Sequence, residues 1–345
     1  MGIQVRRRDF LRGGSAVLVG GTLMGMMPTL RAQDERSYIL TTATTGGTYY
    51  PVGVALATLI KVKLQPKQKI SMSAISSAGS GENVKLLREN QAQFAILQGL
   101  FGQWAWAGTG KVKADGPQRH MRSISMLWQN VEHFVVLNKH VKTGTVDDLR
   151  GIKGKKFSIG KRNSGTEGSG LTILANLGID APNFFDLAYL GYGPSAEAMQ
   201  NGTIEGMNMP GGPPVGALSQ AFASMKGKIT ALDFTDEQVK RANGDGELWT
   251  RYVVNAGVYP GQEKAIQTIA QPNFLAVRED IDDDAVYMIT KTIFENLPFL
   301  HNIHKATKVM SLDSALAGLP APLHPGAAKY YKEVGLQVPQ RLMAA

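Results

Sequence analysis

The 345-residue chain contains no cysteine, which excludes disulfides, thiolate metal sites, a cysteine nucleophile and a lipid-modified N-terminal cysteine. Charged residues are few, at 19%, and hydrophobic residues make up 43%, a composition that excludes a disordered chain or one with many membrane spans. After residue 30 no segment reaches about 18 uninterrupted apolar residues, so the rest of the chain is not expected to span a membrane. Glycine is abundant, at 39 residues, which indicates many tight turns or loops where a ligand meets the backbone.

The N-terminus resembles a twin-arginine export signal. Arg6, Arg7 and Arg8 precede Phe10-Leu11, and a weakly apolar, glycine-rich stretch follows from 13 to 30. We therefore predict a signal peptide over residues 1–32, with an uncleaved N-terminal anchor as the alternative, and a periplasmic protein exported by the twin-arginine route. This segment has five arginines and one aspartate, so the rest retains about +5 of the total charge of +9. That charge does not argue for a nucleic-acid partner.

Short apolar runs alternate with helical patterns through two successive series. Strands are predicted at 38–40, 70–74, 94–97, 123–128 and 133–137, and again at 156–159, 188–190 and 204–209. Residues 52–60 carry apolar side chains at the spacing of one helix face, and the last third of the chain is predicted to be mainly helical. Alternating strands and helices favour an α/β fold, and the length favours two domains.

Three loops of small residues each precede a predicted helix. They read Gly46-Gly47-Thr48-Tyr49, Ser80-Gly81-Glu82-Asn83 and Ser164-Gly165-Thr166. The first N–H groups of a helix lack partners within the helix, and glycine lets a ligand approach them closely. Such loops can hold a carboxylate or phosphate without a metal or cofactor. For any single loop plain helix capping is the alternative, but three in corresponding places favour a binding site.

Signatures of catalysis and metal binding are missing from the sequence. The glycines from Gly165 to Gly170 have the reverse of the dinucleotide spacing, Ala105 replaces the first glycine of a P-loop, and no Gly-x-Ser-x-Gly elbow occurs. Only His301 and His304 among the six histidines lie close in sequence, and no carboxylate completes a metal set beside them. We expect no enzyme activity, no catalytic residues, no metal and no cofactor.

In this order the loops resemble the TAXI family, the extracytoplasmic solute-binding subunits of tripartite ATP-independent periplasmic (TRAP) transporters. Further family-like blocks are Phe94–Gln98, Asp148–Gly151, Gly257–Gln262 and His324–Tyr331, so the resemblance runs from about residue 38 to 335. Two departures stand out. Gly99-Leu100 follow Gln98 where the family usually has Ser-Asp, and Asn163 stands where it usually has glycine.

The resemblance implies a type II periplasmic-binding-protein fold, with two α/β domains and a ligand cleft between them. Domain I would comprise 33–138 plus 271–345, and domain II 139–270. The implied function is capture of a small organic anion or amino acid, such as a dicarboxylate or a glutamate-like molecule, and its delivery to TRAP membrane permease subunits. A periplasmic sensor that signals to a membrane receptor is the alternative, and an enzyme on the same fold would need an acid/base pair in the cleft.

The predicted ligand site combines the three loops with positions that the family places at the cleft. Tyr49 would pack against the carbon skeleton of the ligand, and Lys161 or Arg162 would add positive charge if either faced the cleft. The predicted ligand-binding residues are Gly46, Gly47, Thr48, Tyr49, Ser80, Gly81, Glu82, Asn83, Gln98, Asn163, Ser164, Gly165, Thr166, Gly211, Gly212 and Pro213.

Overall fold

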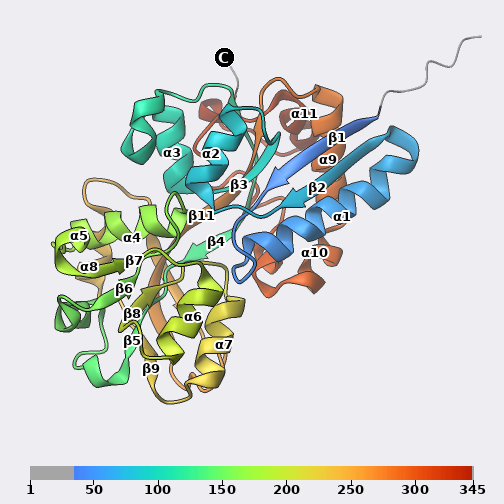
Figure 1. Ribbon diagram of the computed structural model, residues 1–345. Helices are drawn as coiled ribbons and strands as arrows, with labels where there is room; N and C mark the ends of the chain where they lie inside the picture. Colours follow the sequence, from blue (N-terminus) through green and yellow to red (C-terminus); the bar gives the residue numbers. More distant parts are fainter. Residues whose placement is uncertain (1–34, 344–345) are drawn as a thin grey trace, which may run out of the picture. The chain divides into compact units, whose positions relative to one another are not determined.

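The computed structural model describes residues 35–343 as a mixed α/β chain with two β-sheets (Figure 1). This confirms the α/β class, whereas the predicted signal peptide at 1–32 lies outside the described residues. The first sheet contains β1 (Arg36–Thr41), β2 (Ile70–Ile75), β3 (Phe94–Gln98), β4 (Met121–Val131), β10 (Thr250–Val254) and β11 (Ile266–Arg278). The second contains β5 (Phe134–Leu137), β6 (Lys156–Ser158), β7 (Asp186–Ala188), β8 (Gly206–Asn208) and β9 (Ile229–Ala231).

Parallel strands form one side of each sheet, and antiparallel strands form the other. In the first, β1 pairs in parallel with β2 and β3, and the order is β10-β11-β3-β1-β2, with β4 also paired to β11. In the second the order is β7-β6-β8-β5-β9, and β6 pairs in parallel with β7 and β8. Parallel neighbours require crossover helices, and the loops that lead into those helices gather at the carboxyl ends of the strands.

Most of the helices connect these strands. Within 35–343, no helix has the length and apolarity needed to cross a membrane. The α-helices are α1 (Tyr49–Gln68), α2 (Ser80–Arg88), α3 (Gly99–Ala107), α4 (Gly165–Asn176), α5 (Ala181–Phe184), α6 (Tyr192–Gln200), α7 (Gly216–Ser224), α8 (Asp236–Asn243), α9 (Asp283–Glu295), α10 (Leu297–Ile303) and α11 (Pro325–Glu333). Short 3₁₀ helices are η1 (Gly110–Asp115), η2 (Asn138–His140), η3 (Val146–Ile152), η4 (Lys305–Val309) and η5 (Gln340–Leu342).

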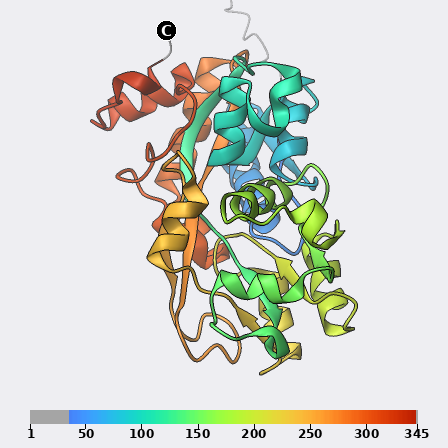
Figure 2. The ribbon, with the colours of Figure 1, turned by 90° about the vertical axis from the view of Figure 1, so that its left-hand side faces the viewer.

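The long strands β4 and β11 run side by side and connect the hydrophobic cores (Figures 1 and 2). Trp128 of β4 and Phe274 of β11 pack in the core around the first sheet, whereas Val131 and Ala270 pack in one of the two cores beside the second sheet. The chain therefore passes from one core to another within both strands. The finer division into domains 33–138 plus 271–345 and 139–270 stays a prediction.

The prediction that the last third is mainly helical was wrong in one respect. Residues 250–254 and 266–278 form β10 and β11, and β11 pairs with β3, β4 and β10. Pro272 lies inside β11 and interrupts its sequence pattern, because proline cannot donate to a strand ladder. β7 also lies two residues before its predicted place.

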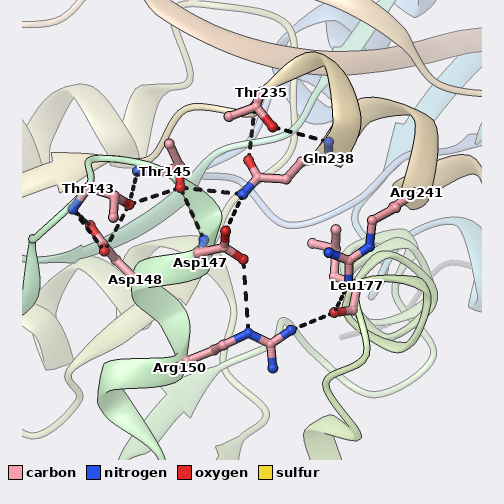
Figure 3. A network of polar contacts seen from close by, with 9 residues as sticks. All are labelled: Thr143, Thr145, Asp147, Asp148, Arg150, Leu177, Thr235, Gln238 and Arg241. Atoms are coloured by element: carbon pink, nitrogen blue, oxygen red, sulfur yellow. Dashed lines mark hydrogen bonds and ion pairs between the residues drawn. The ribbon is translucent and has the colours of Figure 1, made fainter.

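A polar network holds α4 from its C-terminal end (Figure 3). Arg150 and Arg241 both donate to the carbonyl of Leu177, at 2.7 and 2.6 Å, where the helix dipole favours cations. Nearby, Asp148 accepts the backbone N–H groups of residues 142, 143 and 144. Burial raises the pKa of Asp148 and these donors lower it, with a net value below the usual range. The Asp-Leu-Arg-Gly block at 148–151 thus fixes the helix whose other end reaches the site.

Helices α9 and α11 meet at a glycine, which gives a stability test. A methyl group on Gly326 would lie 2.1 Å from the backbone oxygen of Asp283, and backbone cannot move aside as a flexible side chain can. We expect Gly326→Ala to lower the free energy of unfolding by about 2 kcal/mol, measured by chemical denaturation. Gly193→Ala is the matched control, since a methyl group there meets nothing within 4 Å. Equal stability of the two variants would contradict this packing.

Candidate functional site

A cavity with an empty volume of about 460 Å³ lies where loops from both sheets meet. This volume counts all the space between the lining atoms, including space that is open to solvent. The predicted residues that line it are Gly47, Thr48, Tyr49, Ser80, Gln98, Ser164, Gly165, Thr166 and Gly211. The lining residues outside that prediction are Ala43, Thr44, Ala78, Gly79, Asn130, Lys161, Gly191, Tyr192 and Pro210.

Four helices, α1, α2, α4 and α6, begin at this cavity. Thr48, Gly79, Ser164 and Gly191, which precede them, all line it. Over the chain from 35 to 343, α1, α2 and α6 show no hydrogen bond from a capping side chain, whereas the Ser164 hydroxyl accepts from the N–H of Glu167. Helix N-termini carry partial positive charge, so four of them make the cavity attractive to an anion.

Charge at the cavity has one sign. No aspartate or glutamate is among its lining residues within 35–343, and Lys161 is the charged side chain that lines it. The neighbouring Arg162 instead lies over the ring of Tyr189, 3.7 Å from its centroid, in a cation–π contact. Of the two cations that the sequence left open, Lys161 therefore faces the cavity.

Two buried side-chain amides lie on the cavity wall with unused hydrogen-bonding capacity. Gln98 and Asn130 are 3% and 1% exposed. In the described part of the chain, Gln98 Oε1 and Asn130 Nδ2 have no hydrogen-bond partner. Buried polar atoms in folded proteins are nearly always paired, so these two are suited to the polar groups of a ligand. Gln98 was predicted from the end of its strand, whereas nothing in the sequence marked Asn130.

Two tyrosine rings form the aromatic part of the wall. Tyr49 Oη donates to Asn273 Oδ1 at 2.5 Å. Tyr192 Oη donates to the carbonyl of Pro210 and forms a 2.8 Å hydrogen bond with Thr166 Oγ1. Burial, and in smaller part the carboxylate of Glu132, raises the pKa of both phenols, so both stay neutral. Because both hydroxyl groups are already hydrogen-bonded, each tyrosine can contact a ligand through its ring.

Four of the predicted residues do not line the cavity but take part in hydrogen bonds beside it that join its two sides. Glu82 N donates to Asn163 O at 2.9 Å, and Ala217 N donates to Gly46 O at 3.0 Å. Thr48 Oγ1 donates to Gly212 O, also at 2.9 Å. Asn163 has a φ of 61°, in the left-handed region that glycine and asparagine tolerate best.

The other three predicted residues outside the lining have packing roles. Gly81 lies against the backbone of Asn163, where a methyl group would come within 2.5 Å of its oxygen. Asn83 donates to the carbonyls of Thr42 and Ile96, which fixes α2 against the first sheet. Pro213 precedes Pro214 through a cis peptide bond.

Glu132 is a buried acid directly after β4 and close to this wall. It is 0% exposed, and Asn208 Nδ2 donates to its Oε2 at 2.9 Å. Its N–H donates to Ile269 O of β11 at 2.9 Å, which continues the strand pairing beyond Val131. Residues two apart in a strand face the same side, so Glu132 lies on the side of Asn130. Burial raises the pKa of Glu132 to about 7.

This shift predicts a pH-dependent stability difference between the wild type and Glu132→Gln. The folded state keeps the proton while the unfolded state loses it from pH 4.5 upward, so Glu132 lowers stability as the pH rises from there to about 7. The loss amounts to about 3 kcal/mol above that window. Buried His133, whose pKa desolvation lowers to about 4, has the opposite slope, but it is common to both proteins and cancels in their difference.

The measurement is denaturant unfolding of both proteins across this pH range. We expect Glu132→Gln to gain stability relative to the wild type as the pH rises. Glu205→Gln is the control, because hydrogen bonds from Lys139 and His140 hold the pKa of Glu205 below its usual range, so its stability difference from the wild type changes below pH 4.5 and is flat across this range. A wild-type-minus-Glu132→Gln difference that does not change with pH would contradict the burial of an unpaired acid.

The chain is similar to several solved structures. A solved structure from Bordetella bronchiseptica RB50 is 14% identical, with 89% of this chain and 91% of that chain covered and a TM-score of 0.50. The periplasmic aliphatic sulphonate-binding protein SsuA from Escherichia coli is 12% identical, with 87% and 84% covered and a TM-score of 0.43. The GluR0 ligand-binding core from Nostoc punctiforme, in complex with L-glutamate, is 10% identical, with 79% and 99% covered and a TM-score of 0.46.

At these identities the likeness concerns the fold alone. The expected type II periplasmic-binding-protein fold is confirmed: two sheets with crossover helices contribute loops to one shared cavity. A family model with the description NMT1-like family matches residues 40–335, which is most of the chain. The chain therefore belongs to the NMT1-like family.

Proposed function

We propose that this chain is an extracytoplasmic solute-binding protein that captures a small organic anion or amino acid, with dicarboxylates and glutamate-like molecules as the leading class. The observation that carries the proposal is the cavity itself, where four helices begin and where no acidic residue among the described ones forms part of the lining. Membership of the NMT1-like family supports a solute-binding role. Delivery to TRAP permease subunits, the TAXI assignment and twin-arginine export belong to the same proposal and rest on the sequence.

In this proposal the starts of α2 and α4 hold a carboxylate of the ligand. A methyl group on Gly79 would lie 3.3 Å from Gly165 N, so the two helix starts are neighbours. Their first N–H groups, together with Lys161 at the rim, provide donors and charge. The rings of Tyr49 and Tyr192 cover the carbon skeleton, and the amides of Gln98 and Asn130 bind polar groups farther along the ligand.

Closure of the cavity would involve the contacts that join its two sides. The bonds from Glu82 N to Asn163 O and from Ala217 N to Gly46 O lie beside the cavity, and a ligand must enter where such contacts open. We propose that the predicted domains, 33–138 plus 271–345 and 139–270, separate and close by a hinge along β4 and β11. A closed form that differs from the open form is what a permease would recognise.

The function is tested by a thermal-shift screen of residues 33–345 after refolding, since a bound solute can persist through purification. The panel consists of small carboxylates and amino acids. We expect a saturable rise in melting temperature for one chemical class, since a ligand at a hundredfold excess over its Kd stabilises the folded state by about 2.7 kcal/mol. No shift with any compound, together with no small molecule released from the denatured native protein, would overturn the proposal.

A pair of charge variants tests the site within that screen. Asn130→Asp places an acid of nearly the same shape on the cavity wall, so the thermal shift should be lost. Asn302→Asp is the control, because Asn302 is exposed on α10 and outside the cavity lining. If both variants kept the wild-type shift, the ligand would bind elsewhere.

Lys161 and Arg162 are neighbours in the sequence, but their side chains lie in different surroundings. A substitution of one is therefore a control for the same substitution of the other. Lys161→Gln should weaken binding of the screened carboxylate about tenfold, because it removes a cation at the rim of the cavity. Arg162→Gln should leave the affinity unchanged, because this guanidinium lies over Tyr189. Calorimetric titration measures both. Equal losses would show that overall charge, rather than the position of Lys161, attracts the ligand.

A further inference from the structure

Glu132 is a buried acid without a cation beside it. Its Oε1 has no hydrogen-bond partner among residues 35–343, and no ion pair forms to it there. The groups that lower the pKa of the carboxylate are both neutral: the amide of Asn208, which donates to it, and the hydroxyl of Ser169. A buried ionised carboxylate without a counter-charge is costly, because the protein interior solvates charge poorly. An acid in this place needs a physical reason.

The groups that face Glu132 do not supply a positive charge. The phenols of Tyr49 from α1 and Tyr192 from α6 are neutral. The ring of His133, the next residue, hydrogen-bonds to Met209 O and Tyr259 Oη, and its pKa is lowered to about 4 by burial, so it is neutral near pH 7.

The elements that pack beside Glu132 add no free charge either. β8 contributes the amide of Asn208, α4 the hydroxyl of Ser169, and β11 the hydroxyl of Thr268, which donates to the Glu132 carbonyl. The charged residue of α4, Glu167, is paired with Lys111 at 2.9 Å.

Asn130, two residues before Glu132, lines the cavity together with Tyr49 and Tyr192, and strand alternation places Glu132 on the same side as Asn130. The charge of Glu132 also contributes to the raised pKa of both phenols. An anion bound in the cavity would therefore be within a few side chains of this carboxylate. Two like charges in a poorly screened interior repel one another, and the repulsion ends when the weaker acid takes up a proton.

We propose that anion binding in the cavity is coupled to proton uptake at Glu132, so that the solute and one proton bind together. This inference rests on the proposed function, because it requires an anion in the cavity. Glu132 would then be a second, buried binding site whose ligand is a proton. Its role is to set the pH range in which the cavity accepts a negative charge.

The sign of the pH dependence follows from this coupling. At a pH well below 7 Glu132 is protonated with or without the solute, and the affinity is at its maximum. As the pH rises through 7, binding in the wild type has to bring a proton with it, so the affinity falls by up to about tenfold per pH unit. With glutamine at position 132 no proton is needed, and this fall disappears.

The experiment is calorimetric titration of the full mature protein with succinate and with L-glutamate, in buffers of different ionisation enthalpy. The dependence of the observed heat on the buffer counts the protons taken up per solute bound. Slightly above pH 7 we expect uptake of a sizeable fraction of a proton, approaching one, by the wild type and none by Glu132→Gln, which retains binding. Glu205→Gln is the matched control and should take up protons as the wild type does, because Glu205 pairs with Lys139 away from the cavity lining.

The outcomes separate this inference from the proposed function. Binding without proton uptake, or uptake that persists in Glu132→Gln, overturns the inference and leaves solute binding intact. Loss of uptake in both variants would also overturn it, because uptake would then not depend on Glu132 in particular. If neither probe nor any other carboxylate of the screened panel binds, the proposed function fails, and the inference fails with it.

Discussion

The antiparallel pairing of β4 with β11 is the constraint on which the rest of the structure depends. The register runs from Val131 opposite Ala270 to Met121 opposite Arg278, and it includes two irregularities where the strands shift. Each strand passes from one hydrophobic core to another, and we call the part of β4 and β11 between these cores the crossing. The side chains near the crossing have surroundings set by both cores. Without the pairing of β4 with β11, the first sheet would lose its connection to the elements that complete the cavity.

The crossing is also where buried polar groups concentrate. Asn130 pairs with Gln271 in the register, and Asn273 pairs with Gln98 on the other side of β11. All four are nearly or fully buried amides, placed where a hydrophobic core would have apolar side chains. Gln271 Oε1 accepts from Leu100 N at the start of α3, and Asn273 Oδ1 accepts from Tyr49. The amides thus connect the crossing strands to the helix starts that surround the cavity.

The local parts of this arrangement could be predicted from the sequence, and the long-range parts could not. A glycine-rich loop before an amphipathic helix specifies a helix start within a few residues, and the predicted loop residues at 47–49, 80 and 164–166 line the cavity, while their role in ligand binding stays a prediction. Asn130 and Tyr192 lack such a signal, because their positions at the cavity depend on strand pairing and on the opposite sheet. Lys161 and Arg162 are equivalent in sequence, and the ring of Tyr189 is what separates them.

The two departures from the TAXI pattern have local explanations. Asn163 has a left-handed backbone conformation, which glycine adopts freely and asparagine at small cost, so the exchange preserves the turn that presents Asn163 O to Glu82 N. Leu100 is 5% exposed and packs in a hydrophobic core with Phe134 and Trp249, where a carboxylate would be costly. An acid there would also add negative charge beside Gln98, on the wall of a cavity otherwise suited to an anion.

The balance of charge around the cavity explains why its positive character comes mainly from backbone. Helix starts supply partial charges that are fixed by the fold, need no counter-ion and lose no side-chain freedom when a ligand binds. A ring of lysines would bind anions more strongly but would repel one another in the absence of ligand. Lys161, at the exposed rim, avoids that repulsion because solvent screens it. Buried Glu132 adds the opposing influence, since its charge, when present, reduces the attraction that the four helix starts create. In the proposed function, a single proton at Glu132 is therefore enough to change how strongly such a site holds an anion.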